Sequence, residues 1–223
     1  IDNPIVQSQR LDLYQAAAHK LVDEGKAYVC NCSKERLEQV RADQTAKKLS
    51  PRYDGHCRDL NLPFAEGCVI RMKMPENQII KFDDLIHGQI KVNSDTLDDQ
   101  VLLKSDGFPT YHLAHAIDDH EMGTTHVFRG EEWLPSAPKH ILLFEMFGFT
   151  PPQYAHLPVI LSPTKGKLSK RDGATTILEY KKTGYLPEAI LNFLALLGWN
   201  PKTDKEFFSL EELVEKFDLS GVN

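Results

Sequence analysis

The stretch THVFRGEEWLPSAPKHILLFEMFGFTPPQYAHLPVIL, residues 125–161, decides the fold of this 223-residue chain. It opens with a strand pattern from Thr125 to Arg129 and closes with a second one from His156 to Leu161. Between them we expect a helix that begins near Ser136 and ends at Gly148. A helix of this length between two strands returns the chain across a sheet, so the strands run parallel. The sequence therefore predicts an α/β fold here.

Upstream of this unit the pattern is different. Apolar and polar residues alternate between residues 69 and 104, which indicates short antiparallel strands. These three runs begin at Val69, Ile79 and Gln89.

Helical spacing dominates the rest of the chain. We expect helices over about residues 8–24, where Gly25 ends the pattern, and from Ser33, which opens a charged helix. Further helices are predicted from Tyr111 to His120, from Ala174, from Pro187 to Gly198, and from Ser209, which can form a capping box with Glu212.

Composition limits the class of protein. The chain is 41% apolar and 26% charged, which excludes a disordered chain, and it holds no apolar run of the about 18 residues that a membrane span needs. A net charge of −6 disfavours coating of nucleic acid by bulk charge but permits a local basic patch. No targeting leader is readable, and because the chain begins at Ile1 we expect a start that is cut from a longer protein.

One basic cluster stands out. Residues 165–171, KGKLSKR, place four cations in seven residues next to a glycine, after a strand. Alone, such a cluster is more often a solvated surface loop than a binding site. It is accompanied upstream by VFRGEEW at 127–133 and downstream by GYLPEA at 184–189, and this ordered set is more specific than any one motif.

The motifs together resemble a known family. KLSKR at 167–171 looks like the KMSKS signature of class I aminoacyl-tRNA synthetases, and KLSKRDGATTI with GYLPEAILNFLALLGW is similar to bacterial-type glutamyl-tRNA synthetases. The resemblance extends from Val6 to Phe217. It implies an incomplete Rossmann-like catalytic core with an inserted α+β acceptor-binding subdomain and the start of a helical stem-contact domain. The implied boundaries are 1–27, 28–110, 111–163 and 164–223.

The resemblance also implies a reaction. Glutamate would be activated by ATP, with Mg²⁺, as glutamyl-adenylate and then transferred to the terminal ribose of a glutamate-accepting tRNA. We expect a cytoplasmic enzyme, or an organellar one, that is monomeric and makes no use of a membrane. Members of this family carry an arginine-bearing first strand and a HIGH-like motif upstream of anything that resembles residues 6–10. We therefore expect the full-length protein to be a ligase and these 223 residues alone to be weak or inactive.

Site residues follow in three groups. Lys167 and Lys170 would stabilise the departing pyrophosphate, because cations in a closing loop offset its charge, and Ser169 would add a hydrogen bond. Arg129 lies at the end of a predicted strand, where its guanidinium can hold a carboxylate with two hydrogen bonds, although a structural salt bridge is the alternative. By resemblance, glutamate would contact Tyr111, Arg129 and His115, whose role we leave open, and ATP would contact Glu132, Trp133, Val159, Ile160, Lys170 and Arg171.

Three cysteines suggest a metal. Cys30, Cys32 and Cys57 lie on a segment with few apolar residues, which thiolate-bound zinc can order. The family carries a comparable zinc site in many members, although the final ligand of some relatives is replaced here by Arg58-Asp59. Tyr53 or His56 would then supply the fourth ligand, with Tyr53 preferred, or the site is degenerate. We expect Cys68, in a strand pattern, to be a buried thiol.

Other interpretations stay open. His112, His115, His120 and His126 match no ligand spacing, and the Asp118-Asp119 pair could bind magnesium or a ribose but serves equally well as a cap. The alternatives to a glutamate ligase are a zinc-bearing tRNA-binding module without catalysis, an inert fragment, or a non-discriminating or glutaminyl relative. A glutamyl-queuosine-forming relative normally lacks the helical continuation.

Overall fold

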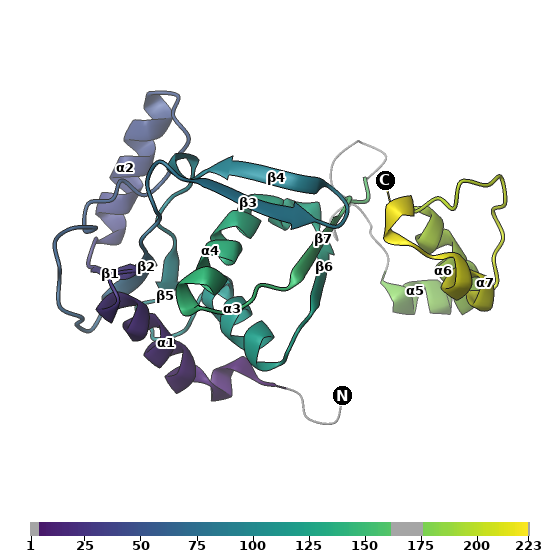
Figure 1. Ribbon diagram of the computed structural model, residues 1–223, viewed down its shortest axis with the longest axis horizontal. Helices are drawn as coiled ribbons and strands as arrows, with labels where there is room; N and C mark the ends of the chain where they lie inside the picture. Colours follow the sequence, from purple (N-terminus) through teal and green to yellow (C-terminus); the bar gives the residue numbers. More distant parts are fainter. Residues whose placement is uncertain (1–4, 162–175, 223) are drawn as a thin grey trace. The chain divides into compact units, whose positions relative to one another are not determined.

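The computed structural model describes residues 5–161 and 176–222, and the chain forms two compact units (Figure 1). Unit 1 consists of residues 1–82, 91–125 and 136–152, and unit 2 consists of residues 83–90, 126–135 and 153–223. The chain therefore passes between the units several times, and each unit is built from segments that are distant in the sequence.

Unit 1 contains a three-stranded antiparallel sheet of β1 (Ala27–Cys30), β2 (Val69–Met72) and β5 (Val101–Leu103), in that order. Strand β1 pairs with β2 along its whole length, and every residue of β1 is buried. A fully buried strand shows no alternation of polar and apolar residues. This explains why the sequence patterns indicated β2 but not β1.

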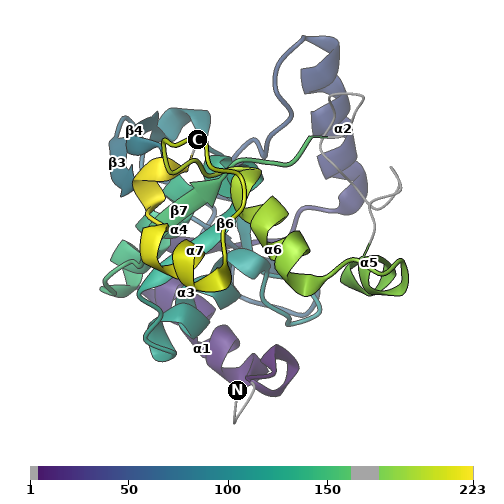
Figure 2. The same ribbon diagram turned by 90° about the vertical axis from the view of Figure 1, so that its right-hand side faces the viewer.

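Four α-helices belong to unit 1: α1 (Leu11–Asp23), α2 (Lys34–Ala46), α3 (Tyr111–Glu121) and α4 (Ala137–Phe147). The predicted caps are confirmed, because the Ser33 hydroxyl accepts a hydrogen bond from the Arg36 amide and Gly148 ends α4 with φ 72°. Helix α2 buries none of its residues and lies at the periphery of unit 1 in both views (Figures 1 and 2).

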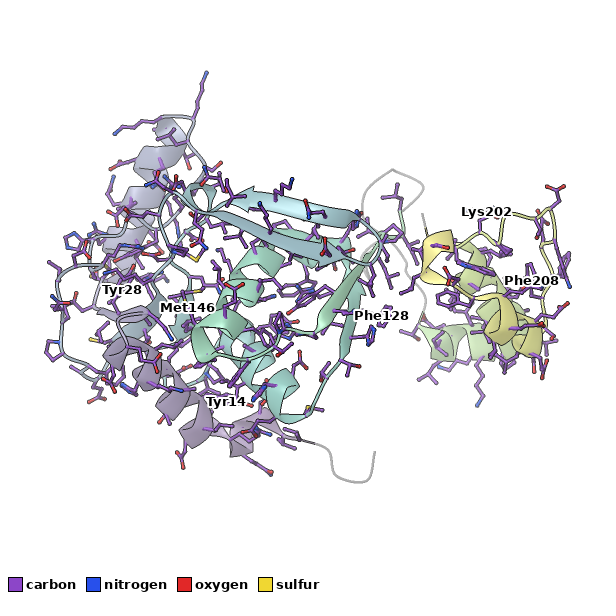
Figure 3. The ribbon with its side chains drawn as sticks, in the orientation of Figure 1. Tyr14, Tyr28, Phe128, Met146, Lys202 and Phe208 are labelled. Atoms are coloured by element: carbon purple, nitrogen blue, oxygen red, sulfur yellow. The ribbon has the colours of Figure 1, made fainter. Side chains whose placement is uncertain are left out.

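The core of unit 1 combines α1, α3 and α4 with the sheet. Tyr14, labelled in Figure 3, is fully buried on α1, and its hydroxyl donates to both carboxylate oxygens of Asp118 on α3, at 2.7 and 2.9 Å. The largest fully buried apolar side chains around it are Leu21, Ile70, Met72, Leu102, Leu103, Leu113, Leu143 and Phe144.

Unit 2 is built on part of a four-stranded sheet with the order β4-β3-β7-β6, formed by β3 (Ile79–Asp84), β4 (Gly88–Asn93), β6 (His126–Gly130) and β7 (Gln153–Leu157). Strands β6 and β7 are parallel and are connected in the chain through α4, which confirms the predicted strand–helix–strand unit. Strands β3 and β4 enter this sheet from segments that belong to unit 1.

Two sequence expectations about the strands were wrong. The closing strand of the parallel unit spans Gln153–Leu157 rather than residues 156–161, because Pro158 has no amide hydrogen to continue the ladder. The runs between residues 69 and 104 were expected to be antiparallel strands. This holds for β2, which is antiparallel to β1 and β5, but β3 lies in the other sheet and pairs in parallel with β7 at Asp84 and Tyr154. Alternation identified the strands but not their partners.

The C-terminal part of unit 2 is helical, with α5 (Ile177–Lys182), α6 (Pro187–Leu196) and α7 (Leu210–Lys216). Helices α6 and α7 contribute to a small cluster around Trp199, Phe208 and Leu213. The predicted capping box of Ser209 and Glu212 is present. The expected helix start at Ala174 lies outside the described residues. Short 3₁₀ turns span Gln7–Gln9, Ser94–Thr96, Glu131–Ser136 and Leu219–Gly221. Within residues 5–161 and 176–222, no helix has the length and apolar character to cross a membrane.

Candidate functional site

Arg129 and His156 face each other across the parallel pair β6 and β7. They are register partners, and the Arg129 Nε–H donates to His156 Nε2 over 3.0 Å. Arg129 was predicted as the last residue of this strand, and it is the last but one of β6, which ends at Gly130. The carboxyl ends of parallel strands are where open α/β sheets bind their ligands.

Two aromatic rings border the Arg129 guanidinium. Its Cζ atom lies 4.9 Å from the centroid of the Tyr154 ring and 5.8 Å from that of Trp133. The faces of these rings attract a cation and fix its plane. A guanidinium held in this way presents its two amino groups as a fork that matches a carboxylate.

A buried acid stands behind His156. The Asp84 Oδ2 lies 2.6 Å from His156 Nδ1, and both side chains are fully buried. Burial alone would raise the pKa of Asp84, but hydrogen bonds from the His87 amide, the His156 ring and further amides lower it. Burial also lowers the pKa of His156, against the opposing effect of Asp84. A neutral imidazole therefore lies between a carboxylate and a guanidinium.

Asp84 and His156 were not among the site residues that the sequence indicated. His156 stands in the otherwise apolar run Tyr154-Ala155-His156-Leu157, and a histidine at the centre of a buried parallel strand needs a polar partner. That signal was available, but its partner is 72 residues away in the sequence, on β3. The pairing of β3 with β7 was needed to find it.

The residues expected around ATP follow the ends of β6 and β7. Glu132 and Trp133 lie in the 3₁₀ turn after β6, and Val159 and Ile160 follow β7. The Val159 amide donates to the Glu131 carboxylate over 3.3 Å, which joins the two segments. The Glu132 carboxylate lies so close to Gly130 that a Cβ atom on residue 130 would overlap it, so the glycine permits this conformation. Lys167, Ser169, Lys170 and Arg171 lie outside the described residues.

Tyr111 and His115 are brought together on α3, in unit 1, whereas Arg129 lies in unit 2. Their rings stack with centroids 5.4 Å apart, and His115 Nδ1 lies 2.5 Å from an Asp119 carboxylate oxygen. His115 is buried and Tyr111 is 44% exposed. Tyr111 can therefore reach a ligand while His115 supports its ring.

The Asp118-Asp119 pair is engaged with protein groups. Asp118 accepts hydrogen bonds from Tyr14 and Gln7, and Asp119 contacts His115 and accepts one from Thr124. These contacts favour a structural role for the pair over a magnesium or ribose site.

The remaining histidines of the sequence cluster are found in ring contacts. His112 Nδ1 lies 2.8 Å from Nε2 of His140, His120 stacks on Phe149, and His126 stacks on Phe128.

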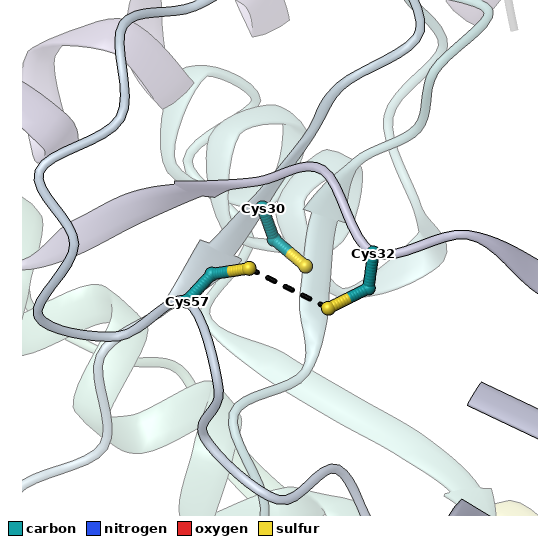
Figure 4. Close-up of side chains that lie close together, drawn as sticks. All are labelled: Cys30, Cys32 and Cys57. Atoms are coloured by element: carbon teal, nitrogen blue, oxygen red, sulfur yellow. Dashed lines mark hydrogen bonds between the residues drawn. The ribbon is translucent and has the colours of Figure 1, made fainter. Parts of the chain in front are cut away.

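Cys30, Cys32 and Cys57 converge in unit 1 (Figure 4), with their sulfur atoms all within 4.8 Å of one another. Zinc–sulfur bonds of about 2.3 Å in a tetrahedron separate the sulfurs by roughly 3.8 Å, so the group matches the spacing of a zinc site. The Tyr53 hydroxyl lies 3.4 Å from the Cys30 sulfur and 3.7 Å from the Cys32 sulfur. The exposed His56 has no described contact with the cluster, so Tyr53 is the better placed of the two expected fourth ligands.

The thiols of this cluster differ in acidity. Burial would raise the pKa of Cys30, but hydrogen bonds from Tyr53, the Cys32 amide and Arg71 lower it to about 7. Burial and the neighbouring thiols raise the pKa of Cys32 to about 11, against the effect of Tyr53. Cys68, expected as a buried thiol, is buried directly before β2 and outside the cluster.

The fold and these motifs define a class of protein: the chain belongs to the class I tRNA synthetases (E and Q), whose catalytic-domain model matches residues 1–223. It is 56% identical over 220 residues to a glutamate–tRNA ligase of Dehalococcoides mccartyi and 49% identical over 227 residues to one of Clostridioides difficile. In each case the match covers 99% of this chain and 45 to 46% of the relative. The chain therefore spans about half the length of these relatives.

A solved structure gives the same result. The crystal structure of a glutamate tRNA ligase from Elizabethkingia meningosepticum, in complex with its amino acid, matches with a TM-score of 0.85 and 42% identity. The match covers 99% of this chain and 51% of that one. The expected family and the Rossmann-like synthetase fold are thus confirmed.

Proposed function

We propose that this chain is part of an enzyme that joins glutamate to tRNA at the expense of ATP. The observation that carries the proposal is the identity of 49 to 56% over 99% of the chain to proteins named glutamate–tRNA ligase. The Arg129 site supports it, because a guanidinium at the end of a parallel strand suits the side-chain carboxylate of glutamate.

The proposed reaction has two steps. The α-carboxylate of glutamate attacks the α-phosphate of ATP, which forms glutamyl-adenylate and releases pyrophosphate. A hydroxyl of the terminal ribose of the tRNA then attacks the activated carbonyl, which transfers the glutamyl group and releases AMP. Catalysis in both steps consists mainly of positioning and charge stabilisation.

Each proposed residue has one role in this scheme. Arg129 pairs with the side chain of glutamate, and Tyr111, supported by His115, is a second glutamate-binding residue. Glu132, Trp133 and the backbone at Val159 and Ile160 border ATP, which carries Mg²⁺. In the basic cluster at residues 165–171, Lys167, Ser169, Lys170 and Arg171 stabilise the phosphates. The enzyme is proposed to act as a monomer in the cytoplasm.

We also propose that Cys30, Cys32 and Cys57, with Tyr53, hold one structural zinc ion. Three cysteine sulfurs and a phenol oxygen are brought within a few ångströms by β1 and the loop around Cys57. When bound, zinc would supply four bonds that tie this loop to the sheet. Among the described residues, the surrounding cluster contains only Tyr28, Leu62 and Val69 as further apolar side chains, so packing alone gives it little support.

The test uses the complete protein. Purified enzyme is incubated with glutamate, ATP, tRNA and labelled pyrophosphate, and pyrophosphate exchange into ATP is measured. We expect exchange that requires glutamate and is not supported by glutamine. Exchange with glutamine in place of glutamate would show that the amino acid is wrongly assigned, and exchange with neither would contradict the ligase assignment.

A further inference from the structure

We propose that Asp84 and His156 are positioning residues that set the orientation of the Arg129 guanidinium for binding a carboxylate. This inference deepens the proposed function and rests on the role given there to Arg129. All three side chains belong to unit 2 and sit on the adjacent strands β3, β7 and β6.

The direction of the hydrogen bonds follows from the chemistry of the three groups. An arginine Nε can only donate, so His156 Nε2, 3.0 Å away, must be an unprotonated acceptor. The ring proton of a neutral histidine is then on Nδ1. It is donated to Asp84 Oδ2, which lies 2.6 Å away.

Asp84 is itself fixed by the backbone. Its Oδ1 accepts from the amides of Ile86 and His87, each at 3.0 Å, and its Oδ2 accepts from the amide of His156 at 3.2 Å. A carboxylate with this many donors stays ionised and cannot rotate without losing them. The position of the acceptor for the His156 ring is therefore determined by the turn after β3.

Burial prevents water from competing for these hydrogen bonds. The side chains of Asp84 and His156 are both fully buried, so water cannot replace either partner. Because a guanidinium is planar, a fixed Nε–H direction and the ring of Tyr154 beside it together determine where the two amino groups point. The turn after β3 fixes Asp84, Asp84 fixes the His156 ring, and the His156 ring fixes the orientation of the Arg129 guanidinium.

Asp84→Asn is the decisive variant. The amide keeps the shape and one acceptor oxygen for the backbone, but its NH₂ group donates to His156 Nδ1. The ring proton then moves to Nε2, where it opposes the Arg129 Nε–H, and two donors face each other. Arg129 must turn away from the position that suits the ligand.

The experiment measures glutamate saturation in the full-length enzyme. We expect Asp84→Asn to raise the KM for glutamate about ten- to a hundredfold, as for the loss of one hydrogen bond to a charged group, with the KM for ATP unchanged. Asp83→Asn makes the same chemical change at an exposed neighbouring position and should leave both values unaltered. An unchanged KM for glutamate in Asp84→Asn would overturn the inference.

Two substitutions of His156 keep the test independent of that variant. The amide oxygen of Gln can accept a hydrogen bond from the Arg129 Nε–H with either Asp or Asn at position 84, whereas the Leu side chain has no acceptor. We expect His156→Gln to retain glutamate binding far better than His156→Leu, and adding Asp84→Asn to His156→Gln to have little further effect. Equal losses in the Gln and Leu variants would contradict a positioning role.

A direct readout is the tautomer of His156, from the ¹⁵N chemical shifts of its ring. We expect the proton on Nδ1 in the native protein and on Nε2 in Asp84→Asn, and a native Nε2–H would overturn the inference. These results also separate a failure of this inference from a failure of the proposed function. If Arg129 does not bind glutamate, Arg129→Ala leaves glutamate saturation unaltered, while the native protein still shows the His156 proton on Nδ1.

Discussion

Arg129 is the residue that we propose binds the side-chain carboxylate of glutamate. Its position at the end of a parallel strand was predictable from the strand–helix–strand pattern of residues 125–161. Its partners were not, because Asp84 and His156 reach it only through the pairing of three strands that are widely separated in the sequence. Local patterns locate a functional residue, whereas the groups that orient it depend on tertiary pairing.

Removing the Arg129 side chain should weaken glutamate binding. Arg129→Ala leaves the side-chain carboxylate of glutamate without its partner, and we expect the KM for glutamate to rise by at least about tenfold. Arg129→Lys keeps the positive charge but cannot form the bidentate hydrogen bonds of a guanidinium, so it should bind glutamate better than Arg129→Ala but less well than the native protein. Steady-state kinetics with varied glutamate provides the measurement, and an unchanged KM in Arg129→Ala would refute the assignment.

We propose that Lys170, in the basic cluster at residues 165–171 outside the described residues, acts mainly in the transition state, as pyrophosphate departs. Lys170→Ala should slow adenylate formation on the order of a hundredfold, or about 3 kcal/mol, the cost of one lost charge-stabilising group. Single-turnover activation in the full-length enzyme measures this step. If the rate of activation is unaltered, the basic cluster is only a solvated surface.

At the scale of elements, the contact between α1 and α3 combines apolar packing with one buried hydroxyl, that of Tyr14. Tyr14→Phe removes the donor to Asp118, whose carboxylate then keeps only Gln7 and Arg10 among these partners. We expect a loss of roughly 1–3 kcal/mol in the free energy of unfolding, because a buried charged acceptor loses a hydrogen bond.

Denaturant unfolding measures that loss. Tyr185→Phe removes the same atom from a side chain that is 59% exposed and serves as the control. Equal stability of Tyr14→Phe and the native protein would mean that the hydroxyl contributes nothing to this contact.

The cysteine cluster gives an element-scale prediction about metal. Protein purified without chelator should carry one zinc ion per chain, and Cys32→Ser should lose it, because three thiolates and Tyr53 leave no spare ligand. Hydrogen exchange should then accelerate around residues 28–62 while α3 and α4 stay protected.

Cys68→Ser is the matched control, since Cys68 is buried but lies outside the cluster. Elemental analysis decides the question. Native protein without zinc, or equal zinc in the native protein and Cys32→Ser, would contradict the proposed ligand set.

The elements themselves were largely predictable, and the reasons are local. Ser33, Gly148 and the Ser209–Glu212 capping box mark helix ends through contacts within a few residues, and all three were found. Strand β1 was missed because it is buried throughout, and the limits of β7 were misplaced because Val159 to Leu161 are apolar without being part of the strand. Burial and sheet partners are properties of the whole fold.

At the scale of the whole molecule, the family follows from the ordered set of motifs and from matches along nearly the entire chain. The chain spans about half the length of its relatives, so activity is a property to be measured on the complete protein. We propose that the complete protein forms glutamyl-tRNA through a site that contains Arg129.

The most direct test is the charging of tRNA with labelled glutamate by the complete protein, beside Arg129→Ala and with labelled glutamine in parallel. We predict acid-precipitable label on tRNA with glutamate and not with glutamine, and a loss in Arg129→Ala that high glutamate concentrations partly restore. Native protein that failed to label tRNA with glutamate would contradict the proposed function. Charging by Arg129→Ala as efficient as that by the native protein at low glutamate would contradict the role of Arg129.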